Sequence, residues 1–203
     1  MVRETGMKKS QRARQAGATL LESLAFLGIA SIIVVGAISM FRAAQSSAQA
    51  KDLIGQINGI RSSTKTLYAS QSYGRTDFSR ESLPSPAGGG RNGPAGTLGS
   101  SLISAASIPD TLSVSGGEIR NSFGGNVFIS GGFNADGESF WIEYQNVPQE
   151  VCLKVAPQIG GSWMGLKINS NSFVDTDSQT FPVATADAQC TPGTSNTMVF
   201  RSR

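Results

Sequence analysis

The hydrophobic pattern of the chain divides its N-terminal third into two stretches. Residues 20–41 are apolar, with Glu22 as the only charged residue, and Arg42 ends the run. About 20 apolar residues are enough for a helix to cross the hydrocarbon core of a membrane. Apolar side chains then recur at spacings of three and four over residues 53–68, which predicts an amphipathic helix. No proline interrupts either stretch, so we expect one helix over about 18–70.

The second half of this helix is predicted to pack through one apolar stripe. The stripe consists of Leu53, Ile54, Ile57, Ile60, Thr64, Leu67 and Tyr68. The polar residues assigned to the remaining positions are Ser46, Gln49, Lys51, Asp52, Gln56, Arg61, Ser62 and Lys65.

Downstream, the pattern changes to that of a loop followed by short strands. Residues 73–100 are rich in Gly, Pro and Ser, which predicts a surface loop, with a short helix after it at 102–107. A tight hairpin turn is expected at 134–137 and a second short helix at 148–158. The predicted strands, bounded by Gly, Asn or Asp, are 118–123, 126–130, 138–144, 163–169 and 196–202. The expected fold class is α+β, with the long helix packed on an antiparallel sheet.

The positive charge of the chain belongs to its first residues. The formal net charge is +3, but residues 1–17 alone hold five Lys and Arg against one Glu. The rest of the chain is close to neutral, so no nucleic-acid partner is expected. The positive-inside rule places residues 1–17 in the cytoplasm and exports everything after Arg42. The chain has no histidine, which removes the usual general base and zinc ligand and disfavours hydrolase function.

Two positions resemble a secretory cleavage site. Ala16, Gly17 and Ala18 fit the small-residue pattern, but they precede the apolar run and therefore face the cytoplasm. Small residues also occur over 42–50, after the run, so a cleaved signal peptide is the alternative to a retained helix.

Two cysteines, Cys152 and Cys190, lie downstream of the apolar run. Two cysteines in an exported protein usually form a disulfide, and only one pairing exists here. Closing a loop of about 39 residues would stabilise the fold by roughly 3–4 kcal/mol on the chain-entropy description. Two reduced, buried thiols in a cytosolic protein are the alternative.

Glycine spacing gives a formal dinucleotide-binding fingerprint, Gly88-x-Gly90-x-x-Gly93. No predicted strand precedes it, and Pro86 and Pro94 flank it, so nucleotide binding is not expected.

The second half of the chain also contains acidic and aromatic residues that are candidate ligands. Asp175 and Asp177, with Asp136 and Glu138, lack the ligand series of an EF-hand and are interpreted as solvated turn carboxylates. No metal or cofactor is therefore expected. The two tryptophans, assigned to the core or to an interface, are Trp141 and Trp163.

The N-terminal features together resemble a type IV prepilin. They are a basic leader ending in Gly17, the small residue Ala18, and then "TLLESLAFLGIAS" with Glu22 fifth after the glycine. The resemblance implies that a prepilin peptidase cuts between Gly17 and Ala18 on the cytoplasmic side. The long leader, Ala18 itself and Ser39 in place of a proline resemble type IVb pilins; Met7 is an alternative start that would shorten the leader.

Further segments resemble the PilS family of type IVb pilins from conjugative thin pili and enteric bacteria. They are 108–112, 120–129, 140–152 and 190–200. The resemblance implies a type IV pilin fold in which Cys152 and Cys190 bound a D-region. It also implies three parts: a leader over 1–17, the helix over 18–71 with 20–41 in the membrane, and a head over 72–203.

The function implied by the resemblance is structural rather than enzymatic. The chain is expected to be a pilin, the major one, held in the inner membrane with its head in the periplasm until it polymerises into an extracellular filament. The expected partners are other pilin subunits, prepilin peptidase and the inner-membrane assembly machinery. Glu22 of one subunit would pair with the α-amino group of Ala18 on its neighbour; the alternative is a glutamate at the headgroup boundary.

Two related structural roles are alternatives to a major pilin. A minor pilin or tip adhesin of the same pilus is one, although the chain ends soon after Cys190. A secretion-system pseudopilin is the other, and such proteins commonly lack the disulfide-bounded loop.

Overall fold

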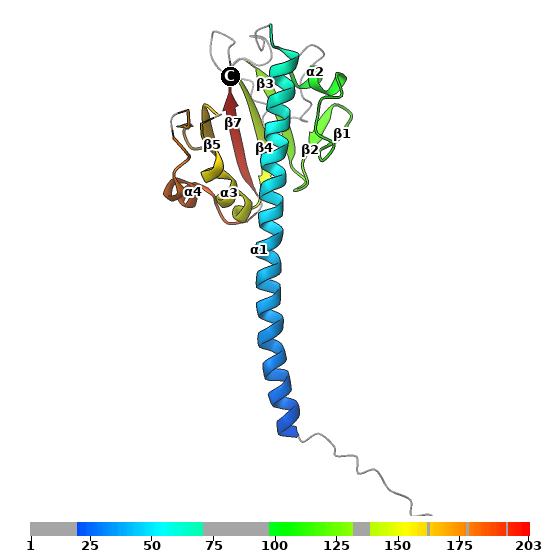
Figure 1. Cartoon of the computed structure of the whole chain (residues 1–203), viewed down its shortest axis with the longest axis vertical. Helices are drawn as coiled ribbons and strands as arrows, with labels where there is room; N and C mark the ends of the chain where they lie inside the picture. The colour runs from blue at the N-terminus through cyan, green and yellow to red at the C-terminus, as the bar shows by residue number, and fades with distance from the viewer. Residues whose placement is uncertain (1–19, 71–97, 132–138, 162, 178, 194) are drawn as a thin grey trace, which may run out of the picture. The chain divides into compact units, whose positions relative to one another are not determined.

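The computed structural model describes residues 20–70, 98–131, 139–161, 163–177, 179–193 and 195–203 (Figure 1). The chain divides into two compact units, Met1–Ala43 and Ala44–Arg203, which are described separately below. The leader, most of the predicted Gly/Pro-rich loop and the predicted hairpin turn at 134–137 lie outside the described residues.

The predicted long helix is confirmed as α1, Leu20–Leu67. Its 48 residues contain no proline. The charges at its ends interact favourably with the helix dipole, because Glu22 lies in the first turn and Lys65 in the last. The helix ends three residues before the predicted boundary, in a turn over 68–70.

The described strands form one antiparallel sheet of seven strands. They are β1 Ser113–Ser115, β2 Glu118–Arg120, β3 Asn126–Gly131, β4 Phe140–Val147, β5 Gly165–Ile168, β6 Val174–Asp175 and β7 Asn196–Ser202. The order across the sheet is β1-β2-β3-β4-β7-β5-β6, so the last strand of the chain lies between β4 and β5. Residues Phe200 and Ile142 face each other across the β4–β7 pair.

Four short helical segments accompany the sheet. They are α2 Leu98–Ser104, α3 Gln149–Val155, the 3-10 helix η1 Ala156–Gln158, and α4 Val183–Gln189. The prediction at 148–158 is confirmed by α3 and η1. The prediction at 102–107 is displaced, since α2 ends at Ser104 and Ala106 has a positive φ of 50° that stops the helix.

One predicted strand is shorter than expected. Strand β2 ends at Arg120 instead of 123, because the side chain of Asn121 turns the chain. Its Oδ1 accepts hydrogen bonds from the backbone N–H of Phe123 at 3.0 Å and of Gly125 at 2.9 Å. Strands β1 and β6 and helix α4 were not predicted, because two to seven residues carry too little hydrophobic periodicity to reveal them.

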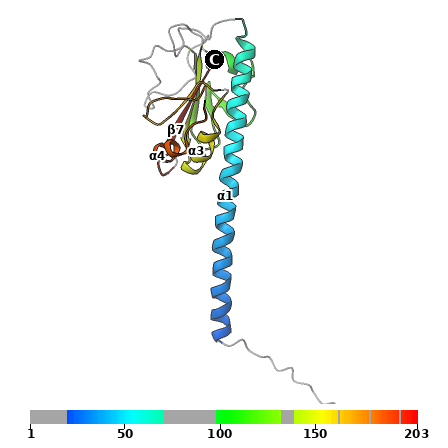
Figure 2. The ribbon, with the colours of Figure 1, turned by 60° about the vertical axis from the view of Figure 1, so that its left-hand side comes forward.

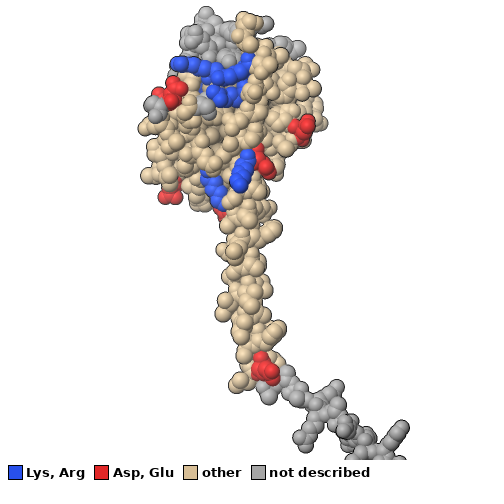
Figure 3. Space-filling model, in the orientation of Figure 1, with Lys and Arg blue, Asp and Glu red and all other residues tan. Residues whose placement is uncertain are grey.

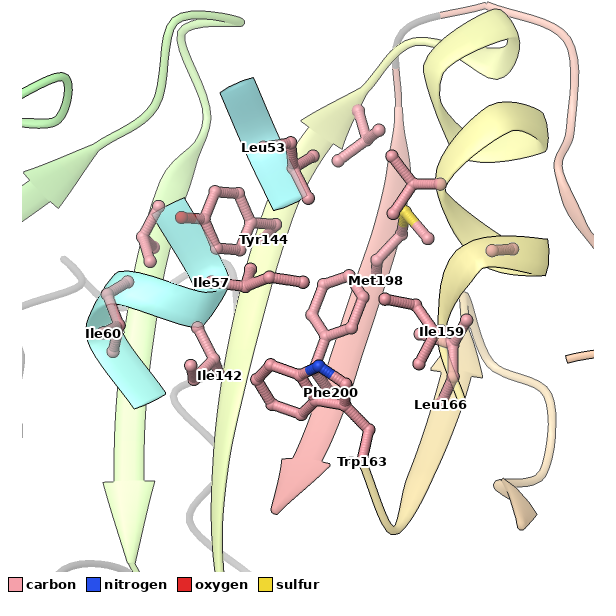
Figure 4. Close-up of a cluster of buried hydrophobic side chains, with 14 of the residues drawn as sticks. Leu53, Ile57, Ile60, Ile142, Tyr144, Ile159, Trp163, Leu166, Met198 and Phe200 are labelled. Atoms are coloured by element: carbon pink, nitrogen blue, oxygen red, sulfur yellow. The ribbon is translucent and has the colours of Figure 1, made fainter. Parts of the chain in front are cut away.

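Within the second unit, the amphipathic half of α1 lies along one face of the sheet (Figures 1 and 2). Figure 4 shows Leu53, Ile57 and Ile60 of α1 facing Tyr144 of β4 and Phe200 of β7. The Tyr144 and Phe200 rings meet edge to face with centroids 6.3 Å apart. The predicted stripe is therefore the core contact, except that Leu67 is 41 % exposed.

Two side chains assigned to the polar faces of the helix are buried instead. Gln56 and Ser46 are each only 5 % exposed. Gln56 donates from Nε2 to Thr111 Oγ1 at 3.1 Å, and its Oε1 accepts from the Tyr144 hydroxyl at 3.3 Å. The hydrogen bonds offset the cost of taking an amide out of water, which sequence spacing alone does not reveal.

The opposite face of the sheet carries a second, smaller apolar cluster. Phe128, Trp141 and Val199 are buried there, with Phe173 packed against them. Trp163 belongs to the main core, with its ring centroid 5.7 Å from that of Phe200. Both tryptophans are thus packing residues, as predicted.

Candidate assembly segment and disulfide-bounded region

The first half of α1 exposes its apolar side chains on all sides. Within the first unit, Phe26 is 71 % exposed and Ile32 is 75 % exposed. Among the described residues, α1 is the one helix long and apolar enough to cross a membrane. Burial of such side chains is favourable by about 1.5–3 kcal/mol each, so this surface needs a covering, either lipid or other helices.

The predicted cleavage and pairing residues lie at the start of this segment. Glu22 is exposed in the first turn of α1. Gly17 and Ala18 lie outside the described residues, so the scissile bond and the Ala18 amine stay predictions.

Two glycines in the exposed segment lie where the described part of the chain leaves room for a larger side chain. A Cβ added at Gly28 or Gly36 would meet nothing within 4 Å. Glycine in a helix interior costs about 1 kcal/mol relative to alanine. Because the described chain does not need these glycines for its own packing, they are suited to close approach by a neighbouring helix.

The predicted disulfide joins α3 to the end of α4 in the second unit. Cys152 and Cys190 have Cα atoms 5.9 Å apart, and both side chains are buried. The enclosed segment contains η1, β5, β6 and α4, and Gln149 donates from Nε2 to the Cys190 carbonyl at 3.1 Å. Figure 2 shows α3 and α4 side by side, and the bond between them ties the segment between β4 and β7 to the rest of the head.

An asparagine that the sequence did not single out organises the end of this region. Asn196, at the start of β7, is fully buried. Its Nδ2 donates to the carbonyls of Val147 at 3.1 Å and Thr191 at 2.9 Å. Its Oδ1 accepts from the Thr191 N–H at 2.8 Å and from Asn169 Nδ2 at 3.0 Å. All the hydrogen-bonding capacity of the amide is used, which joins the end of β4, the turn after β5 and the segment after α4 at one point.

A lysine connects the disulfide-bounded region to the long helix. Lys154 of α3 donates from Nζ to Ser46 Oγ at 2.5 Å and to Ser47 Oγ at 2.9 Å. This contact explains why Ser46 is buried, which the helical spacing had not indicated.

Strand β4 holds a half-buried carboxylate on the face of the sheet opposite α1. Burial raises the pKa of Glu143 above its ordinary value, although a hydrogen bond from Gln145 and the charge of Lys167 act in the other direction. Burial also raises the pKa of Tyr144, whose hydroxyl lies in the core.

The acidic residues considered for calcium form a turn where they are described. The Asp175 carboxylate accepts from the backbone N–H of Asp177 at 2.9 Å. Asp136 and Glu138, like the Gly88–Gly93 pattern, lie outside the described residues. In the part of the chain that the structure describes, no three Asp, Glu, Cys or His side chains are grouped as metal ligands.

Comparison with known proteins adds a family assignment. Residues 86–203 match a family model described as PilS N terminal. A search of curated proteins gave no match.

The solved structures that are similar to this chain include three of pilins. The crystal structure of a type IVb pilin from Salmonella typhi has a TM-score of 0.48 at 22 % identity, covering 70 % of this chain and 91 % of that one. TcpA, a type IV pilin from Vibrio cholerae El Tor biotype, scores 0.46 at 14 % identity, with 78 % and 99 % covered. The NMR structure of the type IVb pilin PilS from Salmonella typhi scores 0.43 at 22 % identity, with 75 % and 94 % covered.

An exposed apolar helix continuing into a packed α+β head with one disulfide defines a type IV pilin, a structural subunit of pili. The family match spans more than half of the 203 residues, so the chain belongs to the PilS family of type IVb pilins.

Proposed function

We propose that this chain is the major subunit of a type IVb pilus, made as a prepilin and polymerised through the first half of α1. The observation that carries the proposal is the uncovered apolar surface of residues 20–41, whose only charged side chain is Glu22. A subunit with this surface is stable in water only after other subunits cover it.

In this proposal the same segment has two successive environments. Before assembly it spans the inner membrane, with the basic leader in the cytoplasm and the head in the periplasm. Prepilin peptidase then cuts between Gly17 and Ala18, and the inner-membrane machinery transfers the helix into the filament core. The filament serves adhesion, aggregation or conjugation at the cell surface.

Glu22 acquires a role in the transfer between these environments. A carboxylate surrounded by apolar helices is costly unless it is neutralised or paired. Cleavage would create a positive α-amino group at Ala18, and pairing of that group with Glu22 of an adjacent subunit would set the axial register.

The experiment is intact-mass analysis of the protein from membranes and from sheared filaments of the bacterium that makes it. The expected mass lacks residues 1–17 and two further hydrogens, the latter because of the disulfide. Recovery of the same species in the sheared fraction would support polymerisation. An N-terminus beyond Phe41 would contradict the proposal, because the assembly helix would then have been removed.

A further inference from the structure

A basic groove runs along one face of the second half of α1. It has a volume of about 630 Å³. It is lined by Asn58, Arg61, Ser62, Lys65, Thr66 and Ala69. These positions are three, four, seven, eight and eleven residues apart from the first, which places them on a single helix face. Figure 3 shows Lys and Arg side chains gathered beside this upper part of α1.

One of the two cations in the groove is held in a fixed position. Arg61 donates from Nε to Ser202 Oγ at 2.7 Å, and its guanidinium carbon lies 5.4 Å from the ring centroid of Trp163. Both contacts leave the two terminal amino groups of the guanidinium unused by the described residues. A guanidinium held in this way can donate two parallel N–H hydrogen bonds to one carboxylate.

The second cation lies one helical turn further along. Like charges four residues apart on a helix repel each other, and burial together with Arg61 lowers the pKa of Lys65. Within the described residues, the one ion pair present joins Arg120 to Glu118, so neither Arg61 nor Lys65 has a carboxylate partner there. The groove therefore suits an anionic group supplied by another molecule.

The chain also carries an exposed surface of complementary charge, on helix α4. Helix α4 exposes Val183 and, one turn later, Asp187. At 67 % exposure, Val183 is the most exposed large hydrophobic side chain described in the second unit. Ala186 is buried and Cys190 ends the helix in the disulfide, so the exposed face is held in place.

We propose that α4 of one subunit docks in the α1 groove of a second copy of this chain. The Asp187 carboxylate binds Arg61 and Lys65, and Val183 packs against the Thr66 end of the groove. The proposal rests on the proposed polymerisation and adds a head-to-head contact to it.

The two surfaces lie on different elements of the same head, α1 and α4 (Figure 2). A contact between two different surfaces is heterologous, so each subunit keeps one surface of each kind available for the next subunit. Such a contact does not close into a dimer and is compatible with an open helical filament.

Charge exchange in the full chain tests the contact. Lys65→Glu and Asp187→Lys should each reduce the pilin recovered in sheared filaments by about tenfold, as expected for loss of one close charge pair. The double variant should assemble better than either single variant, because the Lys65–Asp187 pair is re-formed with its signs reversed, while the unchanged charge of Arg61 keeps the recovery partial. Lys51→Glu and Asp110→Lys change exposed charges outside both surfaces and should assemble as the unaltered chain does.

Membrane-held pilin with an intact Cys152–Cys190 bond shows that a variant has folded. The contact is overturned if Lys65→Glu assembles normally, or if the double variant assembles no better than the single ones; the latter result would assign the groove to a different anionic partner. Absence of filaments from the unaltered chain would overturn the proposed function itself.

A second measurement does not depend on charge. Thr66→Cys and Val183→Cys in one chain should give ladders of covalently joined subunits when intact filaments are treated with a short thiol cross-linker. Subunits that run only as monomers, in filaments that form normally, would overturn the contact.

Discussion

Glu22 is the one charged side chain of the exposed apolar half of α1 and lies in its first turn. The helix dipole favours an acid at this end, but only by about 0.3–1 kcal/mol when the site is exposed. Transfer of the segment into lipid or a helix bundle costs much more unless the carboxylate is neutralised or paired. The residue is therefore better explained by assembly than by the stability of the helix.

Glu22→Ala should leave cleaved, membrane-held pilin at normal amounts but reduce filaments by at least about tenfold, because an ion-pair energy of 1.4 kcal/mol corresponds to a factor of ten. Comparison of sheared and membrane fractions measures this. Asp52→Ala removes an exposed acid from the other half of the same helix and serves as the control. Normal piliation in Glu22→Ala would contradict the pairing role.

Glu143 is a residue whose charge works against folding. Because burial raises its pKa, the folded protein binds a proton more tightly than the unfolded chain does. Its favourable contribution is thus complete at pH values below the ordinary pKa of a glutamate and is lost as the pH rises through the raised value.

Glu143→Gln should therefore raise the melting temperature at neutral pH, and the difference from the unaltered chain should shrink as the pH is lowered towards the ordinary pKa of a glutamate. Thermal unfolding at several pH values measures this. Glu150→Gln, on an exposed position of α3, should change little at any pH. A melting temperature lowered by Glu143→Gln at neutral pH would show that the Lys167 attraction outweighs burial.

At the scale of elements, α1 combines two kinds of helix. Its first half is exposed all round, whereas its second half buries one stripe against β4 and β7. Packing of that stripe holds the helix on the sheet, since helices draw most of their stability in proteins from tertiary contacts.

Ile57→Ala should destabilise the head by about 2–5 kcal/mol, because it leaves a cavity at a fully buried position. Leu67→Ala on the same helix removes a side chain that is 41 % exposed and should cost much less. Denaturant titration of both variants compares the two costs. Equal losses would mean that the helix does not pack through the Ile57 face.

The disulfide is the second feature that stabilises the arrangement of elements, because it closes the segment containing β5, β6 and α4. Replacing Cys152 and Cys190 by serine should reduce the free energy of unfolding by roughly 3–4 kcal/mol. Unfolding in denaturant with and without the bond tests this. A loss below about 1 kcal/mol would show that the Asn196 hydrogen bonds hold the segment without it.

At the scale of the whole molecule, the described hydrophobic core lies entirely within the second unit. Every buried core residue described lies at Ala50 or beyond, inside the unit Ala44–Arg203. A chain lacking residues 1–43 should therefore keep its disulfide and unfold cooperatively, yet be unable to enter filaments. Calorimetry and a filament-incorporation assay measure these properties; loss of cooperative unfolding would show that the first unit contributes to the core.

Several parts of the fold were accessible from local pattern. The extent of α1, the stripe at Leu53, Ile57 and Ile60, and strands β3, β4 and β7 follow from hydrophobic periodicity of sufficient length. The disulfide followed from the cysteine count and the expectation of export.

Other parts were inaccessible because they depend on distant partners. Gln56 and Ser46 have polar side chains on the helix, and only Tyr144 and Lys154, far away in the sequence, explain their burial. Asn196 gains its role from contacts with residues 27 to 49 positions away as well as local ones. Strands β1 and β6 are defined by pairing with neighbours rather than by their own composition.

The sequence alone determined the exposed apolar helix, its single carboxylate and the family resemblance, because each is a property of consecutive residues. The tertiary structure decided the insertion of β7 between β4 and β5 and the polar contacts that hold the disulfide-bounded region on α1. It also placed the Arg61–Lys65 groove and the exposed face of α4 on one head. These features depend on strand order and packing, which bring together residues that no local pattern connects.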